Sequence, residues 1–72
     1  MTPYEKLANA IILSAVRDYR SALKRLARRP DSEIAQSEVK DLERFFYSGW
    51  FGVLTSVDPK YLVKSLREEV DL

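Results

Sequence analysis

The sequence contains no cysteine and no histidine. Without cysteine there is no disulfide bond and no thiolate metal ligand, and without histidine there is no imidazole to act as a general base or to bind a metal ion. These two absences remove the commonest routes to hydrolytic, redox and zinc chemistry. We therefore expect no metal, no cofactor and no enzyme activity.

Glycine and proline are scarce, and the net charge is close to zero. The chain has two glycines and three prolines, and no glycine-rich phosphate loop is present. A formal net charge of +1 gives no overall bias toward nucleic acid. The longest apolar stretch, residues 10–16, is too short for a membrane span, which needs about 20 apolar residues. Because the first residues also lack the features of a signal peptide, we expect a cytoplasmic protein with no membrane partner.

Apolar residues recur at the helical spacing of three and four along most of the chain. In the first part this spacing predicts one long helix from Pro3 to about Arg29, with Thr2 as its N-cap and Pro30 beyond its end. At 1.5 Å per residue this helix is about 40 Å long and forms the spine of the domain. Its apolar stripe consists of Tyr4, Leu7, Ala8, Ile11, Ala15, Tyr19, Ala22 and Leu26.

Three further helical segments are expected after the second proline. A second helix should cover about 32–46, and a short helical turn should cover about 48–54 with Ser48 as its cap. The last helix should cover about 58–70, because an Asp-Pro pair is typical of a helix start. No segment alternates with the period of two that is typical of strands. The sequence predicts a single all-α domain over residues 1–72, built as a small bundle of three main helices plus one short helical turn.

The basic residues of the long helix gather on one face. Residues 1–30 carry seven basic and two acidic side chains, whereas the rest of the chain carries five basic and nine acidic ones. A basic face is typical of phosphate binding in nucleic acids, of docking to an acidic partner, or of a cationic cleft for a small anion between subunits. The plain alternative is a solvated helix face, which the neutral net charge favours. The residues concerned are Arg17, Arg20, Lys24 and Arg28.

The apolar surface of the long helix is wider than two short helices can easily cover. The stripe widens to about half of the helix circumference, and Leu13 lies outside even this arc. A surplus of apolar surface predicts self-association. The alternative is a helix clamped on two sides by its own domain, with Leu13 simply exposed. The predicted subunit contact consists of Ile12, Leu13, Val16 and Leu23.

Five aromatic residues lie close together in residues 45–51. In so small a chain they favour a place in the core, because aromatic side chains bury the most area. A stacking platform for bases or a peptide groove is the functional alternative. Of the five, Tyr47 is the one expected to be exposed; the five are Phe45, Phe46, Tyr47, Trp50 and Phe51.

A longer pattern runs through the same region. Residues 43–62 read ERFFYSGWFGVLTSVDPKYL, and residues 66–69 read LREE. This segment resembles small uncharacterised proteins encoded by phages and prophages of Gram-positive bacteria, with the pattern E-x-F-F-x-S-x-W-F-x-x-L-T-x-x-D-x-x-Y-L and then L-R-x-E. The chain departs from that group at Gly49 and Pro59. The resemblance implies a mobile-element origin and a small helical accessory protein, and it carries no catalytic residue.

These observations favour a non-enzymatic phage or prophage accessory protein. Its expected role is a protein-interaction and self-association module, a homodimer that binds an unidentified host or phage protein. The alternative function is nucleic-acid binding through the basic face of the long helix.

Overall fold

The computed structural model describes residues 2–71, which form four α-helices and contain no strand. The predicted all-α class and the long first helix are confirmed, and each helix begins and ends within one residue of the expected limit. None of these helices is long and apolar enough to cross a membrane. The helices are α1 (Pro3–Arg28), α2 (Glu33–Phe46), α3 (Gly49–Leu54) and α4 (Pro59–Val70).

The limits of α1 follow from the residues at its two ends. The backbone N–H of Glu5 donates to the Thr2 hydroxyl at 3.1 Å. Pro3 occupies the first helical position, where a backbone N–H is not needed. At the other end, the N–H of Arg29 closes the last turn, and Pro30 disfavours helical geometry for the residue before it. The helix therefore ends one residue before the predicted limit.

The shorter helices also start at polar capping residues. The Ser32 hydroxyl caps α2, and the Asp58 carboxylate accepts the N–H of Lys60 at 3.0 Å at the start of α4. Ser48 stands before α3, but its hydroxyl donates to the carbonyl of Phe45 at 2.6 Å and caps nothing in α3. The predicted side-chain cap at Ser48 is therefore wrong, because this serine serves the end of α2.

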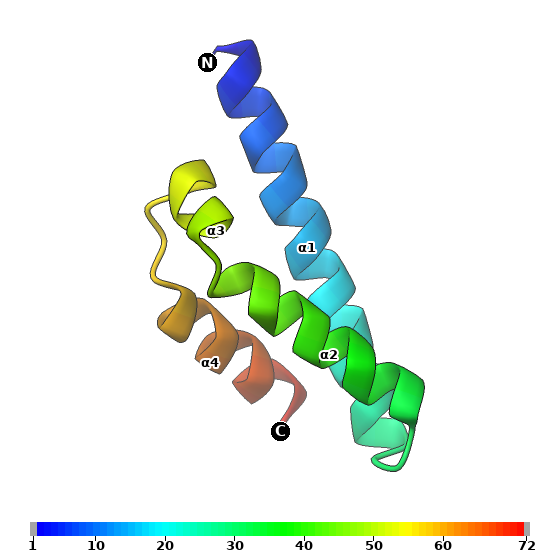
Figure 1. Ribbon diagram of the computed structural model, residues 1–72. Coiled ribbons are helices and arrows are strands. Elements are labelled where there is room, and N and C mark those ends of the chain that lie inside the picture. The colour runs from blue at the N-terminus through cyan, green and yellow to red at the C-terminus, as the bar shows by residue number, and fades with distance from the viewer. Residues whose placement is uncertain (1, 72) are drawn as a thin grey trace.

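The helix lengths decide which parts of α1 are covered. α1 has 26 residues, α2 has 14 and α4 has 12, which gives lengths of about 39, 21 and 18 Å. The longest dimension of the chain, 42 Å, is set by α1. Figure 1 shows that α2 and α4 lie along the C-terminal half of α1 and that the short α3 lies toward its N-terminal half. The first turns of α1 project beyond all three.

The core lies where the C-terminal half of α1 meets the other helices. Tyr19, Phe46 and Phe51 are fully buried. The ring centroids of Tyr19 and Phe46 are 5.3 Å apart, and those of Phe46 and Phe51 are 5.5 Å apart, both in edge-on contact. These distances are favourable for aromatic pairs. The other buried members of this core are Ala15, Ala22, Leu23, Val39, Val63 and Leu66.

Candidate interaction surface

The four residues predicted to form a subunit contact occupy different environments. Leu23 is fully buried in the chain's own core, so its assignment to a subunit contact is wrong. Ile12 and Val16 are half-buried and pack against the same core. Leu13 is 63% exposed. The reason for the difference is that α2 and α4 cover α1 from two sides, which helical periodicity alone does not reveal.

The four predicted anion-binding residues also differ in their ion pairs. Arg20 donates from Nε to the Glu69 carboxylate of α4 at 2.8 Å, and this hydrogen bond lowers the pKa of Glu69, with a smaller contribution from the charge of Lys24. Within residues 2–71, Arg17 and Arg28 are exposed and form no ion pair. Arg20 therefore holds α1 to α4, while the other three leave their charges accessible on the outward face of α1.

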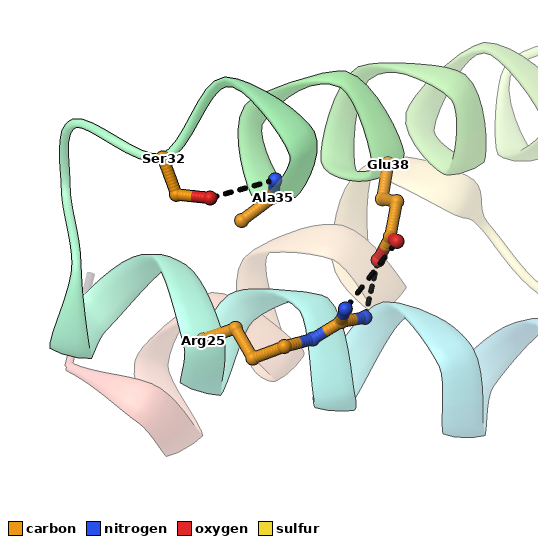
Figure 2. A network of polar contacts seen from close by, with 4 residues as sticks. All are labelled: Arg25, Ser32, Ala35 and Glu38. Carbon is orange, nitrogen blue, oxygen red and sulfur yellow. Dashed lines mark hydrogen bonds and ion pairs between the residues drawn. The ribbon is translucent and has the colours of Figure 1, made fainter.

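A pocket lined by cationic side chains lies at the C-terminal end of α1. It has a volume of about 230 Å³ and is lined by Arg25, Arg28, Arg29 and Ser32. Figure 2 shows that Arg25 reaches across to Glu38 of α2, with one of its two hydrogen bonds at 3.3 Å, and that Ser32 is engaged at the start of α2. Two of the four lining side chains are thus committed to holding α1 and α2 together.

Exposed apolar side chains collect at the opposite end of the molecule. Tyr4, Leu7 and Ile11 are 59%, 61% and 40% exposed. Their spacing of three and four places them on one face of α1, and we call them the N-terminal stripe. α3, which lies toward this half of α1 in Figure 1, also carries two exposed apolar side chains, Trp50 and Val53. The first turns of the stripe stay open because α2 and α4 lie along the C-terminal half of α1.

An open groove continues the N-terminal stripe along α1. Its volume is about 430 Å³, and it lies between α1 and the C-terminal end of α2. The α1 wall is made mainly of small side chains, and the groove is shallow and mostly apolar. It is lined by Ala10, Ile11, Ser14, Ala15, Asp18, Leu42 and Phe45. A second cavity of about 360 Å³ shares Asp18 and Leu42 with it and extends to the Arg25–Glu38 pair.

One polar cluster inside the bundle was not foreseen from the sequence. The Tyr19 hydroxyl donates to Oε2 of Glu43 at 2.6 Å, and Nε of Arg67 donates to the same oxygen at 3.1 Å. Burial first, and then the Glu43 carboxylate, raise the pKa of Tyr19, while the hydrogen bond to Glu43 raises the pKa of Arg67. The cluster joins α1, α2 and α4. The available signal was that a tyrosine in a core stripe needs a partner for its hydroxyl.

The aromatic region divides between the core and the surface. Phe46 and Phe51 are buried and Phe45 is half-buried, which confirms the core assignment for the three phenylalanines. Trp50 is 73% exposed and Tyr47 53%. The exposure of Tyr47 is therefore confirmed, whereas the core assignment of Trp50 is wrong, because α3 buries only Phe51.

Among residues 2–71, no three acidic side chains gather to hold a metal ion, and every buried side-chain polar atom has a hydrogen-bond partner. No known protein family, curated protein or solved structure matches the chain. The arrangement offers an apolar end with a groove and, separately, an outward row of cations.

Proposed function

We propose that this chain is a non-enzymatic protein-interaction module that self-associates through the N-terminal half of α1. The observation that carries the proposal is the N-terminal stripe, three neighbouring apolar side chains left open beside an apolar groove. Contiguous exposed apolar surface of this kind marks interaction sites on soluble proteins. Complete burial of an exposed leucine yields roughly 1.5–3 kcal/mol. Leu7 is 61% exposed, so its burial by a partner adds a large part of this free energy to a small domain.

The polar side chains that meet in the structure support this proposal by what they hold together. Tyr19, Glu43 and Arg67 join three helices, and the Arg20–Glu69 pair joins α1 to α4. Each of these contacts fixes one helix against another. Because these contacts serve the fold, we place the function on the surface. The exposed apolar side chains of the N-terminal stripe are the part of that surface that the fold does not require.

We also propose a phage or prophage origin, with a host or phage protein as the eventual partner. The support is the resemblance of residues 43–69 to small phage-encoded proteins. Most residues of that pattern have a role in the fold here, such as core packing by Phe46 and capping by Asp58. Trp50 and Tyr61 are 73% and 71% exposed instead. These two side chains are the part of the pattern that folding does not account for.

Two exposed leucines on α1 provide a matched test of self-association. Leu7 is 61% and Leu13 63% exposed, but Leu7 lies on the N-terminal stripe and Leu13 on the outward basic face. We expect the wild-type chain to show a mass that rises to that of a dimer with concentration in light scattering. Leu7→Glu should return it to the monomer, while Leu13→Glu should not. The reverse result would favour the contact predicted from the sequence.

Nucleic-acid binding is the second candidate function. The observation in its favour is that Arg17, Lys24 and Arg28 lie on one exposed face of α1, with Arg17 and Arg28 outside every ion pair among residues 2–71. Binding through such contacts must weaken steeply with salt. A titration of short DNA and RNA against salt tests this function, with Arg17→Ala plus Arg28→Ala as the variant and Lys60→Ala as the control. No binding at low salt rejects it.

A further inference from the structure

We propose that two copies of the chain pair through antiparallel α1 helices, with Tyr4 and Leu7 of each copy filling the groove between α1 and α2 of the other. This inference rests on the proposed self-association and specifies its geometry. Both the apolar segment and the groove that receives it belong to the same face of one helix. The chain therefore carries the two halves of one contact.

The N-terminal stripe is the first part of a longer row on α1. Positions 4, 7, 11, 14, 18, 21 and 25 alternate in steps of three and four, the spacing by which two helices meet in a coiled coil. The first three are apolar and uncovered, while the later ones are polar and line the groove or its charged extension beside α2. A two-fold pair uses the same surface on both copies. In such a pair the groove of one copy covers the apolar segment of the other copy, and the reverse.

Charge decides the direction of the two helices. In a parallel pair every residue of the row faces the identical residue of the other copy. Asp18 then opposes the partner's Asp18, and the apolar part of the groove stays empty. Like charges placed against each other destabilise a contact. In an antiparallel pair with Leu7 opposite the partner's Ile11, Asp18 lies next to the N-terminal end of the partner's α1. A carboxylate is favoured there by the helix dipole.

The same antiparallel register gives the Tyr4 hydroxyl a partner. Tyr4 then faces the partner's Ser14, a small residue of the groove wall. Side chains on a helix lean toward its N-terminus, so in the antiparallel pair Tyr4 leans toward the partner's Asp18. The ring covers apolar wall, and the hydroxyl at its tip donates to the carboxylate. This contact uses the one acidic residue that lines the apolar groove.

Cysteine cross-linking of the full chain tests the register. The sequence has no cysteine, so Leu7→Cys and Ile11→Cys each report one position. Four residues correspond to about 6 Å along the helix axis, and this offset separates like positions in the antiparallel pair beyond disulfide reach. We expect mild oxidation of a mixture of the two variants to yield severalfold more covalent dimer than either variant alone. Leu13→Cys, on the outward face, is the control and should cross-link poorly.

Each outcome bears on a different claim. Higher yields from each variant alone than from the mixture indicate a parallel pair, which overturns this inference and leaves self-association standing. A wild-type chain that stays monomeric in light scattering overturns both. Tyr4→Phe and Asp18→Asn should each raise the dimer Kd about tenfold, and the double variant should be no weaker than either one. Additive losses would overturn the contact between Tyr4 and Asp18.

Discussion

The two halves of α1 share the same helical spacing of apolar residues but lie in different surroundings. The C-terminal half holds fully buried Tyr19, Ala22 and Leu23, and ion pairs fasten it to α2 and α4. In the N-terminal half, the groove begins at residue 10, and among residues 3–10 only Ala8 is buried. Helices in proteins owe most of their stability to packing. The comparison shows that α1 is a structural element in one half and an exposed surface in the other.

Truncation of a leucine in each half gives the largest expected contrast. Leu23→Ala leaves a cavity in the core, so the free energy of unfolding should fall by about 2–5 kcal/mol. Leu7→Ala should change it by at most about 0.5 kcal/mol in dilute solution, because the residue is exposed. Urea unfolding of both variants measures the two losses. Similar losses in the free energy of unfolding would contradict the burial of Leu23 and the exposure of Leu7 in the single chain.

The polar cluster in the C-terminal half should contribute a smaller but measurable amount. Tyr19→Phe removes the hydrogen bond to Glu43 and leaves Glu43 with Arg67. Because the acceptor is charged, we expect a loss of about 1.5–3 kcal/mol in the free energy of unfolding. Exposed Tyr4 is the matched control in the other half, and Tyr4→Phe should be neutral in the dilute monomer. Equal effects would contradict the account.

Titration of Tyr19 should give this cluster a pH dependence of known sign. Burial and Glu43 raise the pKa of Tyr19 in the folded state above its ordinary value, which is about 10. The stabilisation is complete below about pH 10 and is lost as the pH rises above that value. The difference in unfolding free energy between wild type and Tyr19→Phe should therefore narrow above about pH 10. A difference independent of pH would show that Tyr19 ionises no differently in the two states.

The exposed ion pair between α1 and α4 should give the smallest effect. The hydrogen bond from Arg20 lowers the pKa of Glu69. Stabilisation from such a group is present above its unfolded pKa and is lost as the pH falls through its folded pKa. Arg20→Ala should return the pKa of Glu69 toward its ordinary value in an NMR titration of the carboxylates, with little change in stability. An unchanged pKa would mean that the pair does not persist in solution.

The helix limits could be predicted because local chemistry sets them. Thr2 with Pro3, and Asp58 with Pro59, mark helix starts through their own hydrogen bonds and backbone geometry. The site could be predicted only in part. The sequence predicts a surplus of apolar surface on α1, but it assigns Leu23 to that surplus and Leu7 and Ile11 to the packed stripe. The structure buries Leu23 and exposes the other two, because the covered arc depends on where α2 and α4 lie.

The sequence also cannot predict which single side chains of the aromatic region are buried. Phe51 and Trp50 are neighbours of similar hydrophobicity, and only the packing of the six-residue α3 buries one and exposes the other. The partners of Tyr19 were missed for a related reason. Glu43 lies 24 residues along the chain from both Tyr19 and Arg67, and only the packing of α1, α2 and α4 brings the Tyr19 hydroxyl and the Arg67 guanidinium to the same Glu43 oxygen.

Amide hydrogen exchange at two protein concentrations tests the central claim most directly. The claim is that the N-terminal half of α1 is open in the single chain and covered by a second copy. In dilute solution, residues 5–12 should exchange much faster than residues 17–24, because few buried contacts hold them. At high concentration, protection should rise over residues 5–12, as binding of a partner stabilises the bound form. Protection of residues 5–12 that does not change with concentration would contradict the account.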